Sequence, residues 1–301
     1  MKKQLSDELA RAHRLWGTVA DLVPDDERPE PVRRREAVAV WSEKQFPVPE
    51  GAVVTPAQGF PGLTVTTPSS RADRALIYFH GGGYNEGDVL MFRELAARLA
   101  EAAGVVVHLP DYPLAPEHPF PAALDAALAA YQTVLAEVGA DRLVVSGDSA
   151  GGGLTLALML RLKQEGIPLP AAAVPISAWT DMTMTAPSYT ERADRDPFVS
   201  AALLEGFAVS YLGDHDRRDP LVSPLFGDLS GLPPLLVEVG SEEVMFDDSR
   251  QFHERALAAG TASELVVTEG APHTWLLFAS FLPEAIDSIE RIGAFVRKQI
   301  G

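Results

Sequence analysis

Hydrophobic residues along the chain form short unbroken runs that alternate with longer stretches of helical spacing. The short runs are apolar at nearly every position, which is typical of strands buried on both faces of a parallel sheet. The runs predicted as strands are 53–55, 63–67, 75–79, 105–109, 143–146, 172–176, 235–239 and 264–268. The stretches predicted as helices are 90–103, 121–138, 152–164, 248–259 and 283–300. This alternation predicts an α/β fold with helices on both faces of the sheet.

Two segments depart from this alternation. Residues 1–45 have helical spacing with a break at the proline-containing stretch 24–31, and residues from about 180 to 219 are polar without a clear strand. We therefore expect an N-terminal helical part of a cap at 1–48 and a catalytic domain at 49–301. A second cap insertion is expected at about 182–218, and the two cap parts are expected to cover one end of the sheet.

Composition narrows the classes of partner. Of 301 residues, 47% are apolar and 22% charged, as in ordinary globular proteins. The chain has no cysteine, which excludes disulfides, thiolate metal sites and a cysteine nucleophile. A formal charge of −17 repels phosphate backbones and anionic lipid, so we expect no nucleic-acid or membrane partner. Lys2 and Lys3 are not followed by an apolar run, so a cytoplasmic location is expected.

A serine stands in a tight turn between a predicted strand and a predicted helix, in the run Gly147-Asp148-Ser149-Ala150-Gly151. An N-capping serine beside well-packed glycines is one interpretation of this short motif. The strand–turn–helix context favours another, in which the turn projects the hydroxyl above the sheet. The amide of Ala150, at the start of the helix, is then a free donor for an oxyanion. We predict Ser149 as a nucleophile.

Three glycines follow His80 at the end of the predicted strand 75–79. Backbone without side chains can turn its amides toward a carbonyl oxygen, so Gly81 and Gly82 are predicted to form an oxyanion hole with Ala150. A merely flexible turn is the alternative. A phosphate-binding loop is excluded because no Gly-Lys-Ser/Thr follows. His80 is expected to order the loop rather than to act as a base.

A serine nucleophile needs a base, and where the serine lies in such a strand–turn–helix the chain order is serine, acid, histidine. His215 lies between two aspartates in the polar insertion and is expected at the surface. His253 lies within a charged helix and is expected on its polar face. His273 follows a proline in the loop after the last predicted strand, where a positioned imidazole is expected. We predict His273 as the base.

Four carboxylates compete for the role of the acid that orients His273: Glu242, Glu243, Asp247 and Asp248. The two aspartates precede a predicted helix, where N-capping is their ordinary role. The two glutamates come immediately after a strand and are better placed to face the histidine loop. On residue type and position alone, either glutamate fits.

With these motifs in place, the chain resembles the hormone-sensitive-lipase-like family of bacterial esterases over nearly its whole length. The resemblance is carried by 80–84, 111–125, 147–151 and the Pro-His pair at 272–273. The run 111–125 is the most specific of these, because no generic catalytic chemistry requires it. The family implies an α/β-hydrolase fold with a mostly parallel sheet of about eight strands and a helical cap. It also implies no cofactor and activity on short- to medium-chain acyl esters. We expect no metal site.

The resemblance also distinguishes the carboxylates. The family pattern is Asp-Pro-Leu-x-Asp, of which the first aspartate is catalytic, and this chain has Glu-Val-Met-Phe-Asp at 243–247. Glu243 is thus implied as the acid, with one methylene more than aspartate, and Asp247 is kept as the alternative acid. Members of the family commonly dimerise through an exposed edge strand. A homodimer is therefore compatible with the resemblance, although the sequence does not require one.

The sequence predicts a serine carboxylesterase that hydrolyses small-molecule esters through an acyl-enzyme. A hydrolase of a specialised ester or lactone on the same triad is an alternative. A minor alternative is a non-catalytic small-molecule-binding protein, although relatives of that kind have lost the catalytic histidine. Tyr84, Phe198 and Phe207 are candidates to line the substrate pocket, although aromatic residues at helical spacing more often pack in a core.

Overall fold

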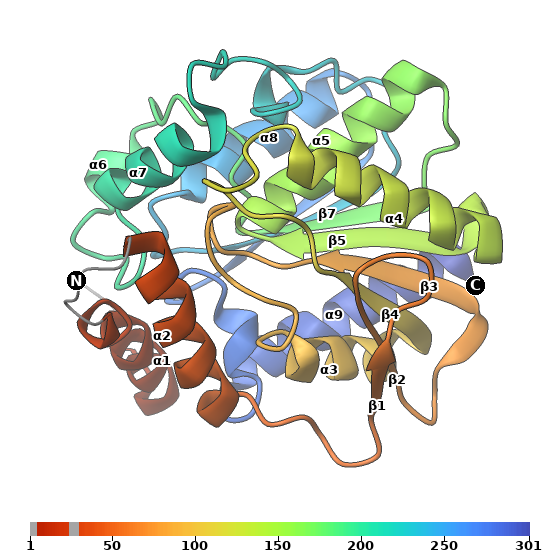
Figure 1. Cartoon of the computed structure of the whole chain (residues 1–301), viewed down its shortest axis with the longest axis horizontal. Coiled ribbons are helices and arrows are strands. Elements are labelled where there is room, and N and C mark those ends of the chain that lie inside the picture. Colours follow the sequence, from red (N-terminus) through yellow and green to blue (C-terminus); the bar gives the residue numbers. More distant parts are fainter. Residues whose placement is uncertain (1–4, 24–29) are drawn as a thin grey trace.

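The computed structural model describes residues 5–23 and 30–301, and its centre is one eight-stranded sheet (Figure 1). The strand order is β1-β2-β4-β3-β5-β6-β7-β8. The strands are β1 Val53–Pro56, β2 Gly62–Thr66, β3 Arg71–Phe79, β4 Val105–Pro110, β5 Leu143–Asp148, β6 Ala172–Ile176, β7 Leu235–Gly240 and β8 Ser263–Thr268. β2 pairs antiparallel with β1 and β4, and the remaining neighbouring pairs are parallel. The predicted mostly parallel sheet is confirmed.

Helices cover both faces of this sheet. In Figure 1, α3 and α9 lie on one face, and α4, α5 and α8 lie on the other. The α-helices of the described residues are α1 Asp7–Gly17, α2 Glu30–Gln45, α3 Arg93–Ala103, α4 Ala122–Val138, α5 Ala150–Glu165, α6 Ser188–Glu191, α7 Ala201–Leu212, α8 Phe246–Ala258 and α9 Pro283–Ile300. The five predicted helices of the catalytic part are confirmed within three residues at each end. Most of the predicted break at 24–31 lies outside the described residues.

The unbroken apolar runs are explained by two hydrophobic cores, one on each side of the sheet. Neighbouring residues of a strand point to opposite faces. In β3, Ile77 packs in the core under α4 and α5, while Leu76 packs in the core with α3 and α9. Both side chains are fully buried, and burying such a side chain contributes about 1.5–3 kcal/mol. A sheet buried on both faces therefore requires apolar residues at successive positions.

The parallel strands bring their carboxyl ends to one edge of the sheet, where ligands bind in open α/β folds. Helices α1, α2, α6 and α7 gather at this edge (Figure 1). Hydrogen bonds attach two of these helices to the edge of the sheet. Trp16 of α1 donates to the main-chain oxygen of His273 in the loop after β8, and Asn85 in the loop after β3 donates to the main-chain oxygen of Phe207 in α7. The cap boundaries at 48 and at about 182–218 remain a prediction. Across the described residues, no helix has the length and apolar character needed to cross a membrane.

Candidate active site

Ser149 lies in the tight turn between β5 and α5. Its backbone has φ 54° and ψ −121°, a strained conformation that residues other than glycine rarely adopt. The flanking glycines make the turn sterically feasible. A Cβ atom would come within 2.4 Å of the Gly151 oxygen at Gly147, and within 2.0 Å of the Phe79 oxygen at Gly151. The side chain of Ser149 is 7% exposed and lines a pocket, so the hydroxyl faces the space where a substrate would bind.

His273 and Glu243 form a buried pair at the same edge. The Nδ1–H of His273 donates to Glu243 Oε2 at 2.8 Å, and both side chains are at most 2% exposed. Burial lowers the pKa of His273, but the surrounding carboxylates, Glu243 first and then Asp196 and Asp148, together raise it above the ordinary value. Burial raises the pKa of Glu243, and the hydrogen bond from His273 offsets part of this increase. A carboxylate on Nδ1 fixes the tautomer that leaves Nε2 to accept a proton.

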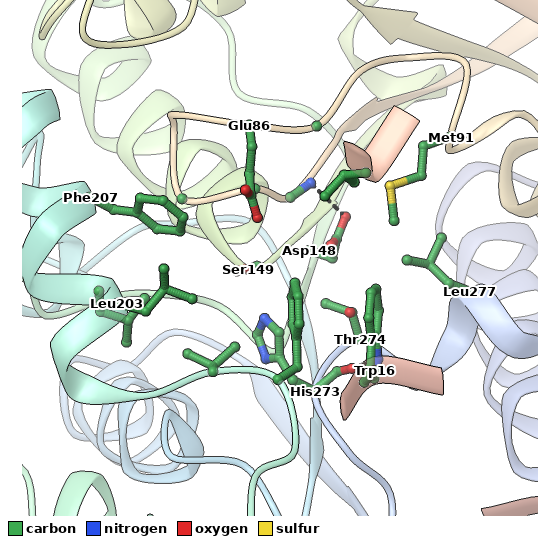
Figure 2. Close-up of a pocket in the computed structure, with 18 of the residues that line it drawn as sticks. Trp16, Glu86, Met91, Asp148, Ser149, Leu203, Phe207, His273, Thr274 and Leu277 are labelled. Atoms are coloured by element: carbon green, nitrogen blue, oxygen red, sulfur yellow. Dashed lines mark hydrogen bonds between the residues drawn. The ribbon is translucent and has the colours of Figure 1, made fainter. Parts of the chain in front are cut away.

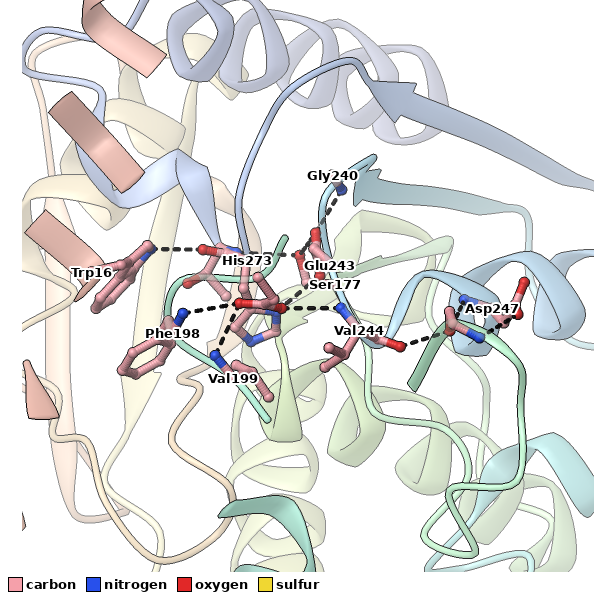
Figure 3. Close-up of polar contacts among 12 residues, drawn as sticks. Trp16, Ser177, Phe198, Val199, Gly240, Glu243, Val244, Asp247 and His273 are labelled. Carbon is pink, nitrogen blue, oxygen red and sulfur yellow. Dashed lines mark hydrogen bonds and ion pairs between the residues drawn. The ribbon is translucent and has the colours of Figure 1, made fainter. Parts of the chain in front are cut away.

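Two further groups hold the carboxylate of Glu243 in place. Its Oε1 accepts hydrogen bonds from Ser177 Oγ at 2.7 Å and from the Gly240 amide (Figure 3). Sequence reasoning did not identify Ser177, although it directly follows β6 and so lies at the catalytic edge of the sheet. The signal available in the sequence was the position of Ser177 at the end of a strand that lies between the strand before Ser149 and the strand before Glu243. With these donors, the buried carboxylate is hydrogen-bonded on both oxygens.

The competing carboxylates are engaged elsewhere. Asp247 accepts from the Ser188 amide at 3.0 Å and pairs with Arg250 at 2.8 Å. Glu242 pairs with Arg195 through both carboxylate oxygens. Asp248 accepts from two backbone amides of the loop after β6, at 2.8 and 2.9 Å. Of the four carboxylates, Glu243 is the one that the structure joins to His273.

The other two histidines after Ser149 also lie apart from it. His215 is exposed and its Nε2 is 2.7 Å from the Asp219 carboxylate. His253 is partly buried, with its Nδ1 2.8 Å from the Ser263 hydroxyl. Neither lines the pocket that contains Ser149 and His273. Between Ser149 Oγ and His273 the structure has no hydrogen bond among the described residues, as is common in enzymes without substrate.

The oxyanion loop differs from the prediction at one position. The Gly81 amide donates to Asp148 Oδ1 at 3.0 Å, so the prediction of Gly81 as an oxyanion donor is wrong. A Cβ atom at Gly81 would lie 2.3 Å from the same carboxylate, which shows how closely the loop packs on β5. The amides of Gly82, Gly83 and Ala150 have no acceptor within the described chain. These three donors are available to a ligand.

The side chains of His80 and Asp148 both bind the main chain of Gly81 and so hold the glycine loop in place. The buried ring of His80 stacks on Tyr112 with 4.2 Å between centroids, and its Nδ1 is 2.8 Å from the Gly81 oxygen. Burial lowers the pKa of His80, so the neutral ring donates to that carbonyl, consistent with a loop-ordering role. Asp148 also accepts from Tyr78 Oη at 2.9 Å. Burial raises the pKa of Asp148 to about 7.

A pocket of about 520 Å³, the part open to solvent included, contains the serine and the histidine (Figure 2). Phe198 and Phe207 line it. Tyr84 does not, so that part of the pocket prediction is wrong: Tyr84 is 2% exposed and stacks on Tyr211 at 4.0 Å. Other apolar lining residues are Trp16, Val38, Met91, Phe92, Val199, Leu203, Leu204 and Leu277. Glu86, Asp148 and Thr274 add polar atoms to this mostly apolar wall.

Trp16 of α1 connects the N-terminal helix to the histidine loop. Its indole Nε1–H donates to the main-chain oxygen of His273 at 2.8 Å (Figure 3). Its ring stacks on Phe198 with 4.2 Å between centroids. The sequence offered no signal for this bond, because the two residues are 257 positions apart.

No group of three His, Asp or Glu side chains in the described parts of the chain is arranged to hold a metal ion.

Comparisons with known proteins place this geometry in a family. Residues 76–277 match the model of a family with an alpha/beta hydrolase fold. An acetyl-hydrolase of Streptomyces hygroscopicus is 43% identical over 84% of this chain and 85% of its own. A carboxylesterase of Mycobacterium tuberculosis is 33% identical over 81% and 82%. The crystal structure of an esterase from the bacterial hormone-sensitive lipase family superposes with a TM-score of 0.93, at 39% identity over 99% and 100%. The chain therefore belongs to the hormone-sensitive-lipase-like family of α/β-hydrolase esterases, as its motifs predicted, and is a carboxylic ester hydrolase.

Proposed function

We propose that this enzyme is a serine carboxylesterase that cleaves short- to medium-chain acyl esters through an acyl-enzyme on Ser149. The observation that carries the proposal is the buried bond from His273 Nδ1 to Glu243, in the pocket that also contains Ser149. That bond leaves Nε2 of the imidazole as the proton acceptor. A serine hydroxyl at neutral pH requires such a base to become nucleophilic.

In the first half-reaction, His273 Nε2 accepts the proton of Ser149 Oγ, and Oγ forms a bond to the ester carbonyl carbon. The Glu243 carboxylate stabilises the imidazolium that results, because the opposite charge lies 2.8 Å away in a buried site. The imidazolium then protonates the departing alcohol. In the second half-reaction, water gives a proton to His273 and its oxygen attacks the acyl carbonyl. The bond between Ser149 Oγ and the acyl carbon then breaks, the imidazolium returns its proton to Oγ, and the carboxylic acid leaves.

Both tetrahedral intermediates carry a negative oxygen that needs donors. We assign this role to the amides of Gly82, Gly83 and Ala150, since Gly81 is bonded to Asp148. Removing one donor of an oxyanion hole typically lowers kcat about 10²- to 10³-fold. The strained turn at Ser149 supports the assignment, because it places the amide of Ala150 directly beside the nucleophile.

The pocket wall supports uncharged acyl groups as substrates. Its side chains are mainly apolar, and each methylene that a substrate buries there contributes about 0.8 kcal/mol. The gain stops when the pocket is full, which sets an upper limit on the favoured chain length. A chain charge of −17 disfavours esters that carry their own carboxylate.

The test is a series of p-nitrophenyl esters from acetate to dodecanoate, with purified wild type and Ser149→Ala. We expect kcat/KM to rise with chain length, to reach its maximum at or below about eight carbons, and to be lost in Ser149→Ala. A fluorophosphonate probe should label the wild type at Ser149 alone. Failure to cleave any ester, or labelling at another serine, contradicts the proposal. A lactone in the same assay tests the specialised alternative.

The remaining partner predictions go with this proposal. We propose that the enzyme acts on a small-molecule ester without a nucleic-acid partner. Sedimentation of the purified chain tests the homodimer, and cell fractionation tests the cytoplasmic location. A protein found only as a monomer excludes the possible homodimer, and a protein found outside the cytoplasm contradicts the predicted location. Neither result affects the esterase proposal.

A further inference from the structure

Two adjacent residues of the insertion, Arg195 and Asp196, bind the turn that carries the acid. The guanidinium of Arg195 donates to both carboxylate oxygens of Glu242, at 2.8 and 2.5 Å. Asp196 Oδ2 accepts from the amide of Val244 at 3.0 Å. Glu242 immediately precedes Glu243 in the chain, and Val244 immediately follows it. The insertion therefore holds the acid turn on both sides of Glu243.

The second oxygen of Asp196 binds the pocket wall. Oδ1 accepts from the amides of Phe198 at 3.0 Å and Val199 at 2.9 Å (Figure 3). Both residues line the pocket, and the ring of Phe198 lies 6.3 Å from that of His273. One carboxylate thus connects the acid turn to two residues that would contact the substrate.

The bond from Val244 to Asp196 satisfies a buried main-chain amide of the turn that carries Glu243. Val244 is fully buried, and a buried amide without an acceptor destabilises the fold. In the described chain, the acceptor comes from the insertion and not from the turn or from β7. The turn that positions Glu243 is therefore completed only when the segment around Asp196 is docked on it.

From these contacts we infer that Asp196 is a positioning residue, which fixes the orientation of Glu243 and the position of the Phe198–Val199 wall together. The inference rests on the proposed function, because it assigns Asp196 a role in orienting the acid of that triad. It makes the acid turn and the acyl pocket a single unit, so that a disturbance of either one changes the other.

The charges around His273 give the inference a readout that a packing role would not change. The carboxylates that interact with the ring come from three elements: Glu243 after β7, Asp196 in the insertion and Asp148 at the end of β5. All three favour the protonated ring. Arg195 is paired with Glu242, and the Arg34–Glu86 ion pair lies between α2 and the loop after β3. Removing the Asp196 charge therefore lowers the pKa of His273.

The experiment compares Asp196→Asn and Asp196→Ala with wild type in full pH profiles of p-nitrophenyl butyrate hydrolysis. For Asp196→Asn, which keeps an oxygen acceptor, we expect the acid limb of kcat/KM to move to lower pH, because one carboxylate that favours the protonated ring is removed. For Asp196→Ala, we expect kcat to fall about tenfold or more and KM to rise, with partial rescue by Asn. Glu205→Gln is the matched control, because it also removes one negative charge from the cap segment, in an exposed pair with Arg217.

A second measurement does not depend on turnover. The proton shared by His273 Nδ1 and Glu243 should give a low-field NMR resonance that shifts or broadens in Asp196→Ala and is unchanged in Glu205→Gln. Unchanged kcat, acid limb and resonance in Asp196→Ala, with thermal unfolding intact, overturns the inference. A change in KM alone also overturns it, since that would limit Asp196 to the pocket wall. If the wild type cleaves no ester, the proposed function fails, and the resonance still tests the positioning role.

Discussion

The catalytic edge of the sheet and the helices that cover it place their residues by different means. Ser149, Glu243 and His273 each directly follow a strand or its turn, so the register of neighbouring parallel strands brings them together. Trp16 and Asp196 come from helices and loops without a ladder, and single side-chain bonds attach them to the same edge. The sheet thus supplies the reactive groups, while the covering segments restrain the loops that hold them.

The largest expected effect tests the sheet side of this comparison. Glu243→Ala should lower kcat about 10³- to 10⁴-fold, because His273 loses the group that orients and stabilises its protonated form. Asp247→Ala should keep kcat within about tenfold, since its carboxylate binds Ser188 and Arg250 instead. Steady-state hydrolysis of p-nitrophenyl butyrate measures both, with circular dichroism as the folding control. The reverse order of effects would identify Asp247 as the acid.

A second prediction concerns stability and pH at the oxyanion loop. Burial raises the pKa of Asp148 to about 7, above its value of 3.8 in the unfolded chain. Its contribution to stability is therefore complete below about pH 4 and is lost as pH rises through 7. From pH 5 to pH 8, the unfolding free energy of Asp148→Asn should therefore fall by about 2–3 kcal/mol less than that of the wild type. Urea unfolding at the two pH values measures it.

Asp248→Asn is the control for this pair of measurements. Burial also raises the pKa of Asp248 to about 7, so its pH-dependent stability should change in the same direction. Asp248 holds the loop after β6, however, whereas Asp148 holds the amide of Gly81. We therefore expect Asp148→Asn to lower ester hydrolysis more than Asp248→Asn does. An unaltered pH slope in Asp148→Asn would show that this carboxyl titrates normally.

A third, smaller effect tests the helices that cover the edge of the sheet. Trp16→Phe keeps most of the ring but removes the Nε1–H bond to the His273 carbonyl, and should lower kcat/KM about 5- to 10-fold, as expected for one hydrogen bond of about 1 kcal/mol. Trp275→Phe is the matched control, since the buried Nε1 of Trp275 has no hydrogen-bond partner within the described residues. Equal losses in both variants would attribute the effect to packing and not to the bond.

The smallest expected effect concerns an exposed ion pair in the predicted insertion. Arg217 and Glu205 form an ion pair in which the Glu205 side chain is 50% exposed. Such pairs contribute about 0.2–1 kcal/mol, and salt screens them. Arg217→Gln should therefore change the unfolding temperature by no more than a few degrees and leave kcat/KM within twofold. A larger loss of activity would show that α7 transmits its position to the pocket.

The errors of the sequence-based predictions have a common physical origin. Gly81 and Gly82 are equivalent as residue types, but the Gly81 amide is bonded to a carboxylate that is 67 positions further along the chain. Tyr84 follows the glycines as a pocket residue would, yet its ring turns away and stacks on Tyr211 from the insertion. In both cases, a partner distant in sequence determined where a group points. Local pattern carries no information about such a partner.

The sequence by itself determined the strands and helices of the catalytic part, the parallel sheet, the serine turn and the histidine loop. Each of these depends on local spacing of apolar residues, on glycines and on strand ends, which are written in the order of the residues. Tertiary structure alone decided that Ser177 holds Glu243, which amides remain free, and that Asp196 and Trp16 hold the loops of the site. Those outcomes depend on contacts between distant segments, and such contacts exist only once the sheet has formed and the helices have packed over its edge.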